Sequence, residues 1–111
     1  MKDSEIKFII SLDENKVPEK IQWEASDSGV FGRKECSATM LSIWDSKDHT
    51  TMRIDLWTKE MPVDDMKRFF YESFMSMADT YQRATQDTAN AEEIRKFSNA
   101  FAKNTDLFRK Q

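Results

Sequence analysis

The feature that most constrains this chain is a change in hydrophobic periodicity at about Pro62. Before that residue, apolar side chains recur at every second position, which is typical of strands with one buried face. After it, they recur with the 3.6-residue period of amphipathic helices. Strands followed by helices, with connections too short for parallel crossovers, predict an α+β domain built on an antiparallel sheet.

Four strands are predicted in the first half of the chain. The alternating segments cover residues 6–12, 21–25, 36–44 and 51–57, and polar turn sequences separate them. Residues 26–35 hold both glycines and predict a loop. The simplest arrangement of these segments is a four-stranded antiparallel β-meander.

The third segment, residues 36–44, does not keep its apolar side chains on one parity. A β-bulge near Met40 would switch this strand from one face to the other. Alternatively, both faces of the sheet are covered, which would also explain why Trp57 is out of phase with its apolar neighbours. Both interpretations remain open from the sequence.

Two helices are predicted in the second half. The first begins at or just after Pro62, with Asp64 and Asp65 in its first turn, where the helix dipole favours negative charge. The second is predicted to begin at Asn90, because Glu93 completes a capping-box-like pattern.

One stripe of the first helix is expected to lie on the sheet, and Asp79 is expected to pair with Arg83 one turn later. The predicted order is therefore ββββαα, with both C-terminal α-helices packed on one sheet face. The stripe consists of Met66, Phe70, Phe74, Met77, Tyr81 and Ala84.

Length and charge narrow the functional classes. A chain of 111 residues predicts a single α+β domain over residues 1–111. A net charge of −3 argues against a nucleic-acid or anionic-membrane binder. The one cysteine suits a reducing compartment, and no targeting or membrane-spanning segment is apparent, so we expect a soluble cytoplasmic protein without membrane insertion.

The residues that usually carry catalysis are sparse. His49 is the only histidine and lies in a polar turn, so we interpret it as a solvated turn residue rather than a metal ligand. Cys36 has no sequence neighbour that would activate it, which favours a buried structural thiol. Two glycines leave no phosphate-binding loop. The sequence therefore predicts no catalytic residue, no metal and no cofactor.

Residues that typically form protein contacts are more frequent in this sequence than residues that typically carry catalysis. On the first helix, Tyr71, Met75 and Ala78 form a second apolar ridge about 100° from the sheet-facing stripe. Either the second helix packs there through Phe97 and Phe101, or the ridge binds another subunit or partner. The out-of-phase Trp44 and Trp57 raise the same question for the sheet, since aromatic residues carry much of the energy of protein interfaces. These five residues, Tyr71, Met75, Ala78, Trp44 and Trp57, are the candidate protein-interaction residues.

Three longer phrases of the sequence resemble a known family. They are SEIKFIISLDENKVPEKIQWEASD at residues 4–27, MRIDLWTKEMPVDDMKRFFYESF at 52–74 and SMADTYQRATQD at 76–87. Together they are similar to the gliding motility-associated GldC family of gliding Bacteroidetes. The resemblance implies a small soluble accessory protein of the gliding machinery and its associated secretion system, with no known enzymatic activity or cofactor.

Three functions follow as hypotheses. The first is a non-enzymatic accessory protein of gliding motility that acts through contacts with other proteins and can form a homo-oligomer. The second is an export chaperone that holds unfolded secreted clients, because strands followed by two helices are the chain order of SecB-type chaperones. The third is a small-molecule-binding domain with a pocket between sheet and helices.

Overall fold

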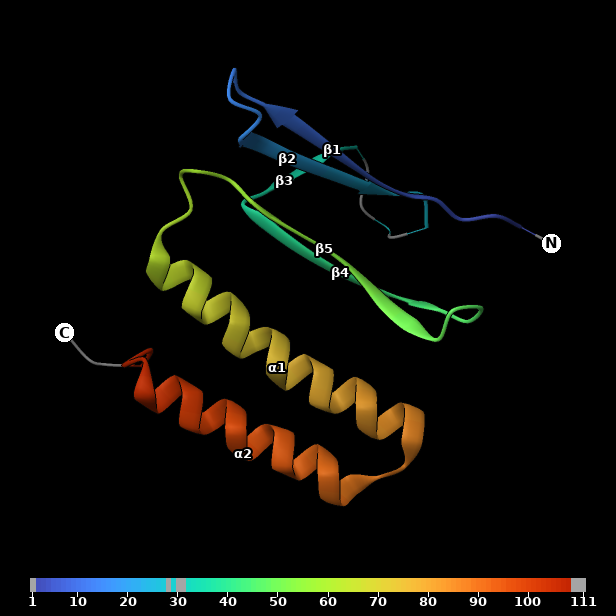
Figure 1. Ribbon diagram of the computed structural model, residues 1–111, viewed down its shortest axis with the longest axis vertical. Coiled ribbons are helices and arrows are strands. Elements are labelled where there is room, and N and C mark those ends of the chain that lie inside the picture. The colour runs from blue at the N-terminus through green and yellow to red at the C-terminus, as the bar shows by residue number, and fades with distance from the viewer. Residues whose placement is uncertain (1, 28, 30–31, 109–111) are drawn as a thin grey trace. The chain divides into compact units, whose positions relative to one another are not determined.

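The fold is described from a computed structural model, which describes residues 2–27, 29 and 32–108. The chain divides into two compact units, Met1–Met61 and Pro62–Gln111. All strands lie in the first unit and both helices in the second (Figure 1). The α+β class is confirmed, and the prediction of a single domain stays a prediction.

The first unit begins with a three-stranded antiparallel sheet of β1 (Ile6–Leu12), β2 (Pro18–Ala25) and β3 (Lys34–Cys36). Strand β2 is central, and its Ile21 is fully buried. The register pairs Phe8 with Trp23 across β1 and β2, and Ile21 with Cys36 across β2 and β3. Of the predicted loop, residues 26, 27, 29 and 32–35 are described, and residues 28, 30 and 31 lie outside the described residues. The loop prediction extends too far, because Lys34 and Glu35 pair with β2 as part of β3.

The turn between β1 and β2 is organised by one carboxylate. Asp13 accepts hydrogen bonds from the backbone N–H groups of Asn15 at 2.8 Å and Val17 at 2.9 Å. Lys16 adopts the left-handed conformation with a φ of 64°. An aspartate is favoured here because its short side chain can satisfy turn N–H groups that no strand reaches.

A second sheet is a two-stranded hairpin of β4 (Ala38–Asp45) and β5 (Thr50–Trp57). Its register runs without a shift from Ala38 opposite Trp57 to Asp45 opposite Thr50. The Asp45 carboxylate accepts from the N–H groups of Lys47 and Asp48, and His49 closes the turn in the left-handed conformation with a φ of 55°.

The single four-stranded meander predicted above differs from this arrangement. The predicted third strand is divided at Ser37, so the described residues form five strands in two sheets. Because the β4–β5 register is unshifted, no bulge occurs near Met40. The pairing partner changes at Ser37: the residues before it pair with β2 and those after it pair with β5. Pro18 at the start of β2 accepts through its carbonyl from the N–H of Lys59 at 3.2 Å instead of continuing the ladder with β3.

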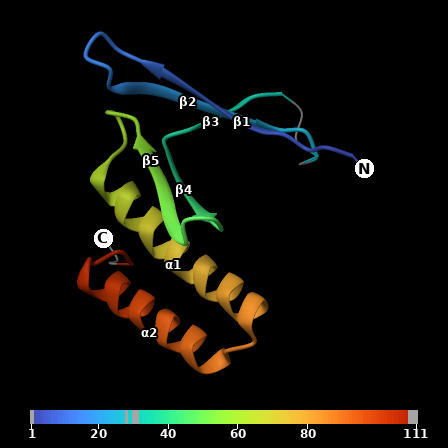
Figure 2. The ribbon, with the colours of Figure 1, turned by 45° about the vertical axis from the view of Figure 1, so that its right-hand side comes forward.

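The second unit is an antiparallel pair of helices, α1 (Val63–Thr85) and α2 (Thr88–Asn104), which lie side by side in both ribbon views (Figures 1 and 2). Pro62 is the N-cap of α1, and Asp64 and Asp65 occupy its first turn, as predicted. Gln86 ends α1 in the left-handed conformation.

Helix α2 begins at Thr88, earlier than the predicted Asn90. The N-cap is Asp87, whose carboxylate accepts from the backbone N–H of Asn90 at 3.1 Å and from its side-chain amide at 2.7 Å. Tyr81 donates its hydroxyl to the same carboxylate at 2.7 Å. These bonds lower the pKa of Asp87, with the Asn90 side chain the largest cause, and the bond to Asp87 raises the pKa of Tyr81.

Small side chains allow the two helices to approach each other closely. The buried residues of the helices are all small: Ala78, Ala91, Ser98 and Ala102. The hydroxyl of Ser98 on α2 donates to the backbone carbonyl of Tyr71 on α1 at 3.2 Å, so this face of α2 meets α1. Larger rings pack at the margins of this contact.

Candidate interaction surface

The β4–β5 hairpin presents two chemically different faces, because side chains alternate along a strand. The register places four residues of each strand on each face. One, named here the tryptophan face, comprises Ala38, Met40, Ser42, Trp44, Thr51, Arg53, Asp55 and Trp57. The other, named the aliphatic face, comprises Thr39, Leu41, Ile43, Asp45, Thr50, Met52, Ile54 and Leu56.

The two tryptophans predicted to take part in protein contacts both lie on the tryptophan face and are exposed. Trp44 is 60% exposed and Trp57 is 55% exposed. Trp44 lies opposite Thr51, six residues before Trp57 on β5, so the two indoles lie roughly 20 Å apart along the hairpin. The ring of Trp44 also meets His49 edge-on, with centroids 6.1 Å apart.

A fixed ion pair separates the two tryptophans. The guanidinium of Arg53 donates to the Asp55 carboxylate through Nε at 3.2 Å and through Nη2 at 2.8 Å. A further bond runs from Arg53 Nη1 to the hydroxyl of Ser42 on β4 at 2.6 Å. Two apolar side chains around a bidentate charge pair give this face both contact area and directional polar groups.

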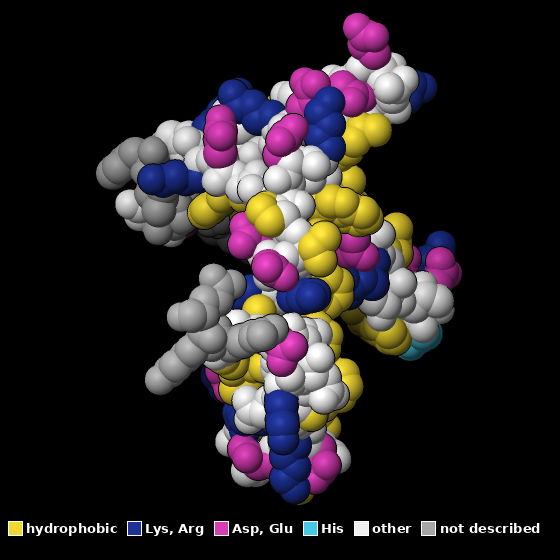
Figure 3. Space-filling model, turned by 90° about the vertical axis from the view of Figure 1, so that its left-hand side faces the viewer, with side chains coloured by type: hydrophobic (Ala, Val, Ile, Leu, Met, Phe, Trp, Pro, Cys, Tyr) yellow, Lys and Arg dark blue, Asp and Glu magenta, His cyan; other side chains and the backbone are white. Residues whose placement is uncertain are grey.

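The aliphatic face carries five apolar side chains among its eight residues, and three of the five are exposed. Ile43 is 51%, Met52 56% and Ile54 48% exposed. Figure 3 shows hydrophobic side chains beside charged ones on the lobe that carries the cyan histidine colour. Exposed apolar residues that cluster on one element mark interaction surfaces more often than scattered ones do.

The predicted helical ridge has a different environment. Ala78 is fully buried, and Tyr71 and Met75 are half-buried. The ring of Tyr71 meets Phe108 edge-on at 5.2 Å, and the Tyr71 carbonyl accepts the Ser98 hydroxyl. Tyr71 is thus engaged within the helical unit.

Phe74 marks a second difference from the predicted helix faces. It was expected on the sheet-facing stripe, yet its ring lies 5.4 Å from both Phe97 and Phe101 on α2. The two rings proposed as partners of the ridge therefore contact the neighbouring stripe. The packing of the helices on a sheet face stays a prediction.

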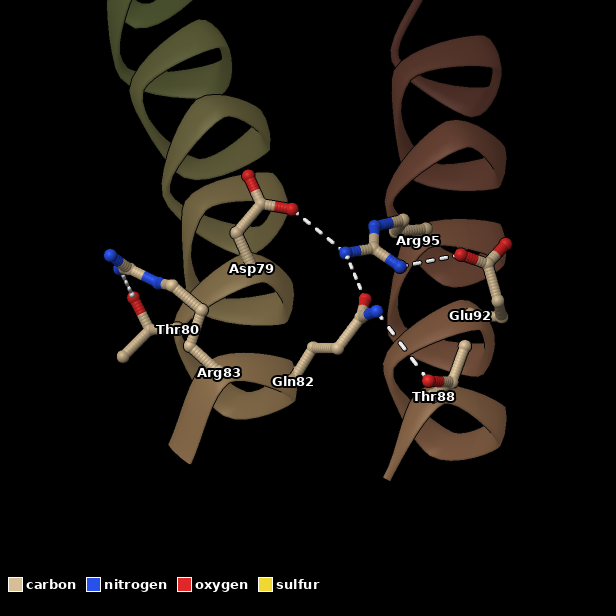
Figure 4. Close-up of polar contacts among 7 residues, drawn as sticks. All are labelled: Asp79, Thr80, Gln82, Arg83, Thr88, Glu92 and Arg95. Carbon is tan, nitrogen blue, oxygen red and sulfur yellow. Dashed lines mark hydrogen bonds and ion pairs between the residues drawn. The ribbon is translucent and has the colours of Figure 1, made fainter. Parts of the chain in front are cut away.

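A charged cluster further joins the two helices (Figure 4). Arg95 on α2 donates to Asp79 and to Gln82 on α1, each at 2.8 Å, and also pairs with Glu92. The two carboxylates, Asp79 first and then Glu92, raise the pKa of Arg95. The predicted Asp79–Arg83 pair does not form, since Asp79 binds Arg95 and Arg83 donates to Thr80.

The residues considered for chemistry lie apart from one another. His49 is exposed in its turn, in keeping with its interpretation as a solvated residue. Cys36 is half-buried, and burial raises the pKa of its thiol. Among the described residues, no three His, Cys, Asp or Glu side chains gather as a metal site. Neither helix in the described part of the chain has both the length and the apolarity to cross a bilayer.

Comparison with known proteins identifies a family. A family model described as "Gliding motility-associated protein GldC-like" matches residues 18–107, and this agrees with the resemblance read from the sequence. No curated protein and no solved structure matches the chain.

Proposed function

Because the chain belongs to the GldC-like family of gliding motility-associated proteins, we propose that it is a non-enzymatic accessory protein of gliding. In this proposal it works in the cytoplasm and binds a protein component of the gliding or associated secretion machinery. The tryptophan face supplies the contact surface.

The exposure of Trp44 and Trp57 on one face carries this proposal. Indole rings are costly to leave in water and are among the residues that contribute most to protein interfaces. The Arg53–Asp55 pair between them offers donors and acceptors that fix the orientation of a partner. The buried Ala78 is unsuited to a docking surface, and so the proposal excludes the helical ridge.

The test is gliding itself. Cells lacking the gene are complemented with the wild-type chain, with a Trp44→Ser, Trp57→Ser variant, or with an Ile6→Ser control. Ile6 is 70% exposed on the other sheet, so the control removes an apolar side chain that is more exposed than either tryptophan. At equal protein levels, we expect the tryptophan variant alone to lose gliding. Normal gliding by that variant would contradict the proposed surface.

One observation favours a second candidate, a holdase for unfolded exported clients. The exposed Ile43, Met52 and Ile54 offer the apolar surface that such chaperones need. A Met52→Ser, Ile54→Ser variant would then lose the ability to suppress aggregation of a chemically unfolded test protein. Absence of that activity in the wild-type chain would remove this candidate.

A further inference from the structure

The outer edge of β5 is unpaired within the described part of the chain. Strand β5 pairs with β4 alone in its sheet. The N–H of Thr58 donates to the carbonyl of Ser37 at 2.8 Å, and these two residues continue the β4–β5 register. Because N–H and C=O groups in an antiparallel ladder alternate in direction, the odd-numbered residues of β5 turn theirs to the outer edge: Thr51, Arg53, Asp55 and Trp57.

An open edge of this kind can pair with another strand, and the charged side chains of the edge strand select the partner strand and its register. Arg53 and Asp55 have opposite signs, lie two residues apart and share one face. If two copies of β5 run antiparallel with Ile54 opposite Ile54, each Arg53 lies opposite the partner's Asp55. The outward backbone groups of Arg53 and Asp55 also face each other in this register, so the ladder bonds can form.

Neighbouring registers are disfavoured by the same two residues. A shift of two residues one way places Arg53 opposite Arg53, and a shift the other way places Asp55 opposite Asp55; like charges directly opposite are destabilising. A shift of one residue sends the side chains of the two strands to opposite faces. The outer edge of β4 offers no such selection, because Asp45 is the only charged residue of that strand.

We propose that β5 pairs antiparallel with β5 of a second copy of this chain, with Ile54 on the two-fold axis. The result is a four-stranded sheet in the order β4–β5–β5–β4, which satisfies the strand edge and adds stability that a lone two-stranded hairpin lacks. On the aliphatic face, Met52 meets the partner's Leu56. On the tryptophan face, Thr51 lies between its own Trp44 and the partner's Trp57.

The charge register can be tested by sedimentation of the full chain. We expect the wild-type chain to sediment as a dimer. Arg53→Asp and Asp55→Arg should each raise the dissociation constant of that dimer on the order of 100-fold or more. The doubly exchanged R53D/D55R variant should recover the dimer. Arg68→Asp is the control, because it removes an exposed ion pair with Glu72 on α1 and should leave the dimer intact. A wild-type monomer at every attainable concentration, or a folded double variant that stays monomeric, would overturn the proposal.

Disulfide trapping tests the axis independently, in a Cys36→Ala background. The Cα atoms of two Ile54 residues in a non-hydrogen-bonded pair would lie about 4.5 Å apart, within reach of a disulfide. Two Met52 residues on the same face would lie about 14 Å apart, beyond reach. Oxidation should therefore link Ile54→Cys and not Met52→Cys. Equal linking of both cysteine variants, or of neither, would overturn the proposal. The proposed function of the tryptophan face does not depend on this dimer and is tested separately by gliding.

Discussion

The ammonium of Lys59 donates to the carboxylate of Asp13 at 3.0 Å, although the two residues are 46 positions apart in the chain. The same ammonium reaches Glu19 at 3.2 Å. Together with the backbone bond from Lys59 to Pro18, these contacts hold the β1–β2 turn against the end of β5. They connect the two sheets of the strand unit.

This cluster predicts a specific acid sensitivity. The bond from the Val17 N–H, followed by the bond from Lys59, lowers the pKa of Asp13 below its ordinary value of 3.8. A lowered folded-state pKa contributes stability that is present above the unfolded value and is lost as pH falls through the folded value. Unfolding by urea between roughly pH 4 and 2 should therefore show a steeper loss of stability for the wild type than for Asp13→Asn.

Glu14→Gln is the matched control for that titration, because it neutralises an exposed carboxyl in the same turn. It should keep the wild-type slope. If Asp13→Asn and the wild type lost stability in parallel, Asp13 would not be the group responsible.

The helix contact predicts a smaller loss of stability from one change at Ser98 than from another. Ser98 is fully buried, and its hydroxyl bonds only to a carbonyl of α1. Replacement by Ala keeps the close approach and should cost about 1 kcal/mol or less. Replacement by Leu overfills the contact and should cost about 1–3 kcal/mol. Denaturant unfolding followed by circular dichroism distinguishes them, and equal costs would contradict close packing at this position.

The candidate interaction residues should separate into two groups by stability. Ala78→Glu places an unpaired carboxylate at a fully buried position and should destabilise the chain by about 3–5 kcal/mol. Trp44→Ser and Trp57→Ser remove exposed side chains and should each change stability by about 1 kcal/mol or less. Thermal unfolding of the three variants checks this, and severe destabilisation by either tryptophan change would place that residue in the core.

The periodicity of the sequence predicted local structure well. Strand β1 covers the predicted residues, Ile6–Leu12, and α1 begins directly after Pro62. Both features depend on neighbouring residues: alternation in the strand, and the fixed φ of proline with acidic residues behind it at the helix start. The helix α2 began earlier than predicted because Asp87 was a better cap than Asn90, a choice that the Tyr81 hydroxyl reinforces from the preceding helix.

Periodicity could not predict which segments far apart in the sequence pair with each other. The division at Ser37 depends on β2 pairing with residues before it and β5 with residues after it. Asp79 was expected to pair along its own helix, but Arg95 reaches it from α2. For the candidate surface, the out-of-phase position of Trp57 was a usable signal, and it correctly separated this residue from Met52 and Ile54.

The most direct test of the proposed contact surface is photo-crosslinking in gliding cells. A photoreactive phenylalanine analogue replaces Trp44 in one strain and, as an exposed control position on another sheet, Ile6 in a second. We predict that Trp44 alone links to a defined protein of the gliding or secretion machinery, other than a second copy of this chain. Identical products from both positions, or no such product from Trp44 in cells that glide normally, would contradict the account.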